Sequence, residues 1–203
     1  MVVTVQERKR DAIGRAALTL FASDGYERTS VDAIAAEAGV SKRTVYSHYG
    51  DKESLFLSVV RDTYDRMLAR ITEIVDRTAW DRDVPSALTC CVTEITHSIV
   101  RAPERATLSR LLMTEAPHFP ALIDLLHART VTPVIAVPLD RLSRSGRLTI
   151  PDPTQAADHL AALTFDHVST RSLMGTVPLS DDETQSLINS GVRVFLRAYT
   201  PAS

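Results

Sequence analysis

The sequence predicts an all-α protein of about nine helices, with an N-terminal three-helix domain and a larger C-terminal helical domain. Three observations favour this class: apolar residues recur at helical spacing along most of the 203 residues, a glycine corner separates two short amphipathic segments near the N-terminus, and prolines mark most later segment starts. We place the domain boundary after residue 52, which gives domains 1–52 and 53–203.

Residues 6–23 predict the first helix. Ile13, Ala16, Ala17, Leu20 and Phe21 recur at helical spacing, and Gly25 ends the segment. We expect this helix to support the two that follow.

The stretch TSVDAIAAEAGVSKRTVYSHYGDK, residues 29–52, predicts a helix-turn-helix motif at about 30–49. Its first helix has an apolar face, and Thr29 with Asp32 three residues later has the spacing of a helix-capping pair. Gly39 permits the left-handed turn that reverses the chain, and Ser41 caps the second helix.

The outward face of the second helix carries donors suited to phosphates and base edges. These residues are Lys42, Arg43, Thr44, Tyr46, Ser47 and His48. A helix of this length spans roughly two turns and fits the ~12 Å wide major groove of B-DNA. The alternative is a solvated polar face on an ordinary helical pair.

The continuation VYSHYGDKESL, residues 45–55, extends the motif without a gap. With Ile-Ala and Ala-Gly-Val-Ser before it, this run resembles the TetR family of bacterial transcriptional regulators over about the first 60 residues. The resemblance implies a DNA-binding head with Phe21 and Tyr26 in its small core. It also implies a C-terminal domain that binds an inducer.

We expect the DNA-binding residues to divide by role. Arg43, Thr44 and His48 are the candidates for base contacts. Thr29, Lys42, Tyr46 and Lys52 are the candidates for phosphate contacts, and Ser41 and Ser47 complete the surface.

A long connecting helix is predicted from about residue 52 for some 25 residues, because apolar positions repeat every three or four residues without a proline. Beyond it we expect helices at about 85–101, 103–114, 119–145, 153–174 and 181–199. Pro133 and Pro138 should kink the third of these, and Gly146 and Gly175 should close the helices before them.

The apolar run around residues 108–126, with sparse histidines, suits either a ligand cavity or a plain helical core. The family resemblance favours a pocket for a small hydrophobic or aromatic effector. The candidate lining residues are Cys91, His97, Leu112, Met113, His118, Phe119, Ile123 and Phe165.

The last two predicted helices, 153–174 and 181–199, are candidates for a homodimer interface, because a two-fold dimer offers two reading helices to a palindromic DNA site. An intrachain hairpin is the alternative. The candidate interface residues are Ala157, Leu160, Ala161, Thr164, Leu187, Val192 and Phe195.

Composition narrows the function classes. The net charge is −2, so bulk charge does not indicate nucleic-acid binding, but all three lysines, at positions 9, 42 and 52, lie in or beside the predicted head. The N-terminus lacks the features of a signal peptide, and no apolar run reaches 18 residues, so we expect a cytoplasmic protein. Adjacent Cys90 and Cys91 suit small core residues better than a redox sensor.

We expect no enzymatic activity, cofactor or metal. Asp166 and His167 are neighbours on a predicted helix and do not face one another, and no Gly-rich phosphate loop or metal-ligand spacing is present. The sequence therefore predicts a ligand-responsive regulator that binds double-stranded DNA. The alternatives are an all-α small-molecule-binding or partner-binding protein that has lost operator binding and, less favoured, an enzyme.

Overall fold

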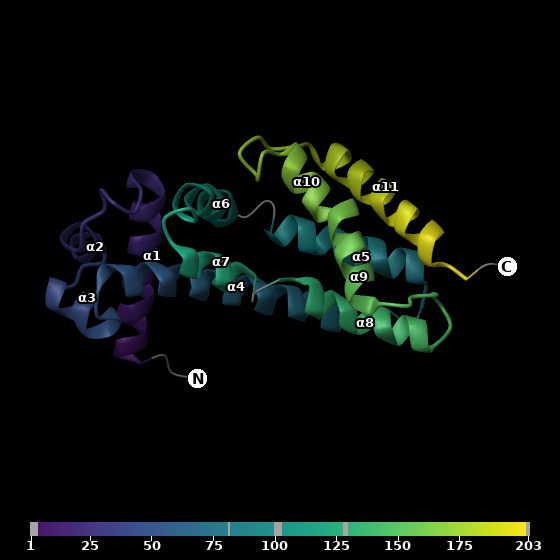
Figure 1. Cartoon of the computed structure of the whole chain (residues 1–203), viewed down its shortest axis with the longest axis horizontal. Coiled ribbons are helices and arrows are strands. Elements are labelled where there is room, and N and C mark those ends of the chain that lie inside the picture. Colours follow the sequence, from purple (N-terminus) through teal and green to yellow (C-terminus); the bar gives the residue numbers. More distant parts are fainter. Residues whose placement is uncertain (1–3, 81, 100–102, 128–129, 202–203) are drawn as a thin grey trace. The chain divides into compact units, whose positions relative to one another are not determined.

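The structure is a computed structural model that describes residues 4–80, 82–99, 103–127 and 130–201. Within these residues the chain forms eleven α-helices and no strand, as Figure 1 shows in sequence colours. The all-α prediction is confirmed.

The chain divides into two compact units. The first holds residues 1–66 and 107–129, and the second holds residues 67–106 and 130–203. The predicted functional boundary at residue 52 remains a prediction, whereas the compact units are divided within the long helix α4 (Lys52–Arg77).

The first unit is built around the N-terminal helices. It contains α1 (Val5–Asp24), α2 (Val31–Glu37), α3 (Lys42–Tyr49), the start of α4, the end of α6 (Pro103–Glu115) and α7 (Pro120–His127). Thr4 begins α1 by accepting the Glu7 N–H, while the Glu7 carboxylate accepts the Thr4 N–H at 2.7 Å. The buried core draws on all of these helices; its members include Ile13, Phe21, Ile34, Val45, Phe56, Leu108 and Leu122.

The second unit is a helical assembly around α11 (Asp181–Tyr199). Its other members are the end of α4, α5 (Val84–Ile99), the start of α6, α8 (Thr132–Arg144), α9 (Pro153–Leu163) and α10 (Phe165–Arg171). Helix α11 packs against α5, α9 and α10, and α8 packs against α9 (Figure 1). The chain's one tryptophan, Trp80, packs against this core and donates its indole N–H to the Val75 carbonyl at 2.9 Å.

Two predicted helices are each divided in the structure, which is why eleven are seen rather than nine. The predicted helix 119–145 is two helices, α7 and α8, because Pro133 lies in the first turn of α8, where a missing N–H costs no hydrogen bond. The predicted helix 153–174 is divided at Thr164, whose φ of −122° and ψ of −95° are not helical.

Gly175 does not close the helix before it, contrary to expectation. Helix α10 ends at Arg171, and the chain then turns through Leu173 and Met174, whose φ values are +47° and +57°. These residues occupy the left-handed region that side chains disfavour. Gly146, by contrast, follows α8 with a φ of +73°, as predicted.

Candidate nucleic-acid interface

The turn between α2 and α3 is formed by Gly39. Its φ is +65°, and two backbone bonds close the end of α2: the Gly39 N–H donates to Ala36 at 3.1 Å and the Val40 N–H donates to Ala35 at 2.9 Å. These two hydrogen bonds form the Schellman motif of a helix C-terminus. The motif requires a left-handed backbone at the first of the two donor residues, which is Gly39. The predicted turn is therefore present, and α3 begins within three residues of it.

Helix α3 is anchored on one face and open on the other. The Ser41 hydroxyl caps it by accepting the Thr44 N–H at 3.1 Å, as predicted. Val45 is 1% exposed and Tyr49 is 9% exposed, so these two residues hold the helix against the core of the first unit. The remaining face is free to meet a ligand as large as a duplex.

The predicted DNA-binding residues on and beside α3 form one polar surface. Ser41, Lys42, Arg43, Tyr46 and Ser47 are exposed, while Thr44, His48 and Lys52 are half-buried. The Ser41 and Thr44 hydroxyls lie 2.8 Å apart, and the Ser47 hydroxyl donates to the Thr44 carbonyl at 2.8 Å. The α3 side chains named here occupy the part of the helix surface that the buried Val45 and Tyr49 leave open to solvent.

Both lysines of this surface have partners within the subunit. The Lys42 Nζ donates to the Asp32 carboxylate at 2.7 Å, and this hydrogen bond raises the pKa of Lys42. The Lys52 Nζ donates to the Glu27 carbonyl at 3.2 Å and lies 4.3 Å from the centre of the Tyr26 ring. Ion pairs and hydrogen bonds this exposed are weak, so a phosphate can replace either partner.

Thr29 does not belong to this surface. It is 2% exposed, and its hydroxyl lies within hydrogen-bonding distance of the Gly25 carbonyl at 2.8 Å and the Leu20 carbonyl at 3.0 Å. The assignment of Thr29 to phosphate binding is therefore wrong, because its hydroxyl is used to close the end of α1. Its predicted capping role is also wrong, since Ser30 caps α2 by accepting the Ala33 N–H.

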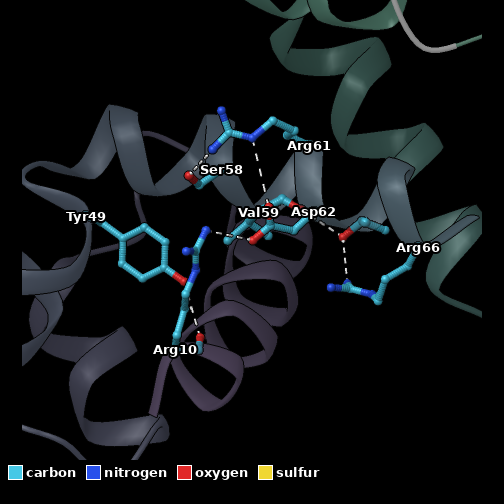
Figure 2. Close-up of polar contacts among 8 residues, drawn as sticks. Arg10, Tyr49, Ser58, Val59, Arg61, Asp62 and Arg66 are labelled. Atoms are coloured by element: carbon cyan, nitrogen blue, oxygen red, sulfur yellow. Dashed lines mark hydrogen bonds and ion pairs between the residues drawn. The ribbon is translucent and has the colours of Figure 1, made fainter. Parts of the chain in front are cut away.

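The buried side of α3 is tied to α1 and α4 by a polar network that the sequence did not indicate (Figure 2). The Tyr49 hydroxyl donates to the Arg10 carbonyl at 3.2 Å, and burial raises the pKa of that phenol. The Arg10 guanidinium pairs with the Asp62 carboxylate at 3.4 Å, and Arg61 approaches the same carboxylate at 3.9 Å. Arg10 therefore joins the N-terminal part of α1 to α4.

Residues from α6 and the turn before α7 also pack onto Tyr26 and Phe56 in the first unit. The Glu115 carboxylate, which is 7% exposed, accepts the Tyr26 backbone N–H at 3.1 Å. The Phe119 ring lies 4.6 Å from the Tyr26 ring and 5.2 Å from the Phe56 ring, centre to centre. No local pattern predicts a contact between residues 89 positions apart.

The residues predicted to line a ligand pocket are distributed over both units. In the first unit, Leu112 is buried, Phe119 is half-buried, and the other three are exposed: Met113, His118 and Ile123. In the second unit, Cys91 and Phe165 are buried and His97 is exposed. None of the eight lines the cavity beside Val168 and Thr184 or the groove beside Pro85 and Val192, so their pocket assignment stays a prediction.

The two cysteines differ in their surroundings. Cys91 is buried, as expected for a core residue, whereas Cys90 is exposed, so the expectation of a core position is wrong for Cys90. Burial raises the pKa of the Cys91 thiol to about 11. The reactive thiolate of Cys91 is therefore disfavoured at neutral pH.

Six of the seven residues predicted at the subunit interface lie inside the subunit instead. Ala157, Leu160, Ala161, Thr164, Val192 and Phe195 are all buried in the core of the second unit, and Leu187 is half-buried. Their assignment to the interface is wrong, because α9 and α11 pack against each other within one chain. The contact is close: a Cβ at Gly191 would collide with the Leu163 carbonyl oxygen.

The part of the chain that the structure describes contains no group of three or more His, Cys, Asp or Glu residues placed to hold a metal ion. None of its helices combines the length and the apolar character needed to cross a lipid bilayer.

Two family models match the chain. The model of the tetR family of bacterial regulatory proteins matches residues 13–59, which include the whole of α2 and α3. The model of the C-terminal domain of AefR-like transcriptional repressors matches residues 86–201.

Individual relatives agree with these models. The repressor AcnR of Corynebacterium glutamicum is 24% identical over 191 residues, covering 91% of this chain and 92% of AcnR. The helix-turn-helix regulator YuxN of Bacillus subtilis is 41% identical over 68 residues, covering 34% of this chain but only 23% of YuxN.

A solved structure of similar architecture covers the full length. The crystal structure of a TetR-family regulator from Mesorhizobium loti superposes with a TM-score of 0.88 and 28% identity, over 98% of this chain and 100% of that one. The glycine turn, the capped polar helix and the matches to both parts of the chain agree. The chain therefore belongs to the TetR family of bacterial DNA-binding transcriptional regulators.

Proposed function

We propose that this regulator is a ligand-responsive repressor that binds a palindromic operator as a homodimer, with α3 of each subunit in a major groove. The observation that carries the proposal is the polar face of α3, which presents Lys42, Arg43, Tyr46 and Ser47 to solvent while Val45 fixes the opposite face. Many surface helices have a buried apolar side, so the proposal depends on the cationic and hydroxyl-bearing character of the exposed side and on its position directly after the Gly39 turn.

We assign each residue of this surface to a base or a phosphate from the reach of its side chain and from the group that it contacts within the subunit. Arg43 is exposed and has the forked guanidinium that reads guanine edges, so we assign it, with Thr44 and His48, to bases. Lys42 and Lys52, held beside α2 and the start of α4, are assigned to phosphates together with Tyr46. Thr29 is not among the residues that we assign to phosphates.

The dimer surface is reassigned to the outward side of α11. Ser186, Ser190, Val194 and Ala198 repeat at intervals of four and are exposed, so they form a stripe of small side chains on one face. The helix begins with Asp181, Asp182 and Glu183 and carries Arg193 and Arg197 near its end. An antiparallel two-fold pairing of α11 would place acidic residues of one copy beside basic residues of the other.

The proposed regulation follows from thermodynamic linkage between effector binding and operator binding. If an effector and the operator favour different arrangements of the dimer, each lowers the affinity of the other by the same factor. Repression would then be relieved as the effector binds.

The DNA-binding assignment is tested by selecting bound sequences from random duplex DNA and measuring variants on the selected site. Lys52→Ala should weaken binding to every sequence and lower the salt slope of log K by about one, since one phosphate contact is lost. Arg43→Ala should weaken the selected site about tenfold and relax the preference at one base pair.

The control for both variants is Arg144→Ala, a charge removed from the exposed end of α8, which should leave DNA affinity unchanged. Equal losses for all three variants would show that net charge, rather than the α3 surface, governs binding. No preferred sequence at low salt would contradict the proposed function itself.

The dimer assignment is tested by placing a charge on the stripe. Val194→Glu should convert the dimer to monomer in sedimentation, because two carboxylates would face each other across the two-fold axis. The matched control is Val137→Glu on α8, where the native valine is 51% exposed against 47% for Val194. Dissociation by the control alone would place the interface on α8 instead.

A further inference from the structure

The side chain of Tyr26, the residue after the glycine that ends α1, meets the first residue of α4. The Lys52 Nζ lies over the Tyr26 ring, 4.3 Å from its centre, and donates to the Glu27 carbonyl at 3.2 Å. A cation this close to a ring face is attracted by the negative potential of the ring. Lys52 is also half-buried, so its ammonium group has a defined location before any ligand binds.

These two contacts leave the Lys52 ammonium group able to bind a phosphate. An ammonium group has three N–H donors. The Glu27 carbonyl takes one and the ring face takes another, so at least one donor remains for a phosphate oxygen. A lysine that is already held in place loses less conformational freedom on binding, and its phosphate contact therefore contributes more to affinity.

The Tyr26 ring is itself held by three other aromatic rings. The Phe56 ring lies 5.1 Å and the Phe119 ring 4.6 Å from it, centre to centre. The Phe21 ring stacks on it at 5.7 Å. Phe21 and Phe56 are fully buried, so they belong to the core of the first unit. Phe119 instead comes from the turn before α7, far along the sequence from the N-terminal helices.

The backbone of Tyr26 is held by the same turn. The buried Glu115 carboxylate accepts the Tyr26 N–H at 3.1 Å, and the Glu115 carbonyl accepts the Phe119 N–H, also at 3.1 Å. A carboxylate acceptor makes such a bond stronger than one between neutral groups. Glu115 and Phe119 are therefore fixed to each other, and they contact Tyr26 at its backbone and its ring respectively.

We propose that Tyr26 is a positioning residue for DNA binding: held by Glu115 and Phe119, its ring places the Lys52 ammonium group where it meets a phosphate of the operator. The turn 115–119 thereby contributes to DNA affinity without contacting DNA. The inference rests on the proposed function, from which it takes the phosphate contact of Lys52. The alternative, that Tyr26 only fills the core, is distinguished by changing the charge distribution of the ring while almost keeping its size.

The central test therefore uses two rings of similar size at position 26. Tyr26→Phe keeps an electron-rich ring face and should bind the selected duplex within about twofold of the native protein. A trifluorinated phenylalanine at the same position withdraws electron density from the face. It should weaken binding about threefold relative to Tyr26→Phe, which corresponds to the loss of an exposed cation–π contact.

The control repeats both ring changes in the Lys52→Ala protein, which has no cation over the ring. Without Lys52 the fluorinated and unfluorinated rings should give the same affinity at the same salt concentration. A loss caused only by poorer packing of the core would persist in this background, because it does not depend on the lysine.

The contribution of the turn is measured with a second pair of variants. Phe119→Leu removes the ring that contacts Tyr26 and should weaken operator binding about twofold, again only when Lys52 is present. The matched control is Leu125→Ala on α7, which also removes partly buried apolar atoms from the first unit. It should lower the free energy of unfolding but leave the DNA affinity of the folded protein unchanged.

Three results would overturn the positioning role: equal affinity of the two ring variants, tighter binding by the fluorinated one, or a loss that persists without Lys52. If Lys52→Ala leaves both affinity and salt slope unchanged, the phosphate assignment fails and this inference fails with it. If the native protein selects no duplex, the proposed function itself is contradicted. A normal loss in Lys52→Ala together with no effect of the ring contradicts only this inference.

Discussion

Gly39 in the first unit and Gly191 in the second are both required, but for different physical reasons. Gly39 has a φ of +65° and nothing within 4 Å of the position a Cβ would take, so only its backbone conformation demands glycine. Gly191 lies inside the helix α11, where any residue fits the backbone, but a Cβ would meet the Leu163 carbonyl carbon at 2.7 Å and its oxygen closer still. One glycine is required by the local chain and the other by a helix from elsewhere in the sequence.

The largest effect is expected at the helix crossing. Gly191→Ala should lower the free energy of unfolding by about 3 kcal/mol, because the backbone of α9 cannot move aside as a flexible side chain would. Trp80 fluorescence reports this loss in a denaturant titration, since this tryptophan packs against the same core. Protein concentration must be held constant, because the proposed dimerisation would also contribute to stability. A change below about 1 kcal/mol would mean that the two helices separate easily.

A smaller loss is expected at the turn. Gly39→Ala should cost about 1–2 kcal/mol, the penalty of a left-handed alanine, and should weaken operator binding by displacing α3. Gly39→Asn should cost less, because asparagine tolerates this conformation better. Circular dichroism and DNA titration measure the two effects. Equal costs for alanine and asparagine would show that backbone conformation is not what demands glycine here.

The smallest change, and one of opposite sign, is expected at Gly14. This glycine lies within α1, and an added Cβ would make an ordinary contact 3.9 Å from the Tyr49 hydroxyl. Gly14→Ala should therefore raise the free energy of unfolding by about 0.5–1 kcal/mol through helix propensity alone. Destabilisation instead would mean that Tyr49 needs this space, and melting temperatures of the three alanine variants would rank the positions directly.

The contrast between local and tertiary constraints also explains how much of the structure could be predicted from the sequence. Ser41, Gly39 and Val45 could be assigned because each constraint acts within a few residues of the chain, and all three assignments describe one short motif. The fold class and the ranges of α1, α4 and α11 followed from helical periodicity in the same way. No local sequence pattern indicated that the predicted helix 153–174 would be divided at Thr164.

The errors concern contacts between distant residues. Thr29 was placed toward DNA because hydroxyls suit phosphates, but its hydroxyl meets the Leu20 carbonyl nine residues away. Ala157 and Ala161 were placed between subunits, yet both are buried in the core of the second unit, where α9 packs against α8 and α11 of the same chain. The cavity beside Val168 and Thr184 was missed because α5, α10 and α11 combine to form it. Residue type alone does not reveal which other residue a side chain will contact in the folded chain.

The contact between Glu115 and Tyr26 has a consequence for protein engineering. A DNA-binding head cut from the chain after its first helices would be incomplete, because the carboxylate of Glu115 and the ring of Phe119 complete the packing around Tyr26. A chimera that imports only residues 1–66 would leave the Tyr26 amide without its acceptor. A functional graft on this scaffold should transplant residues 107–129 as well, as a second, non-contiguous insert.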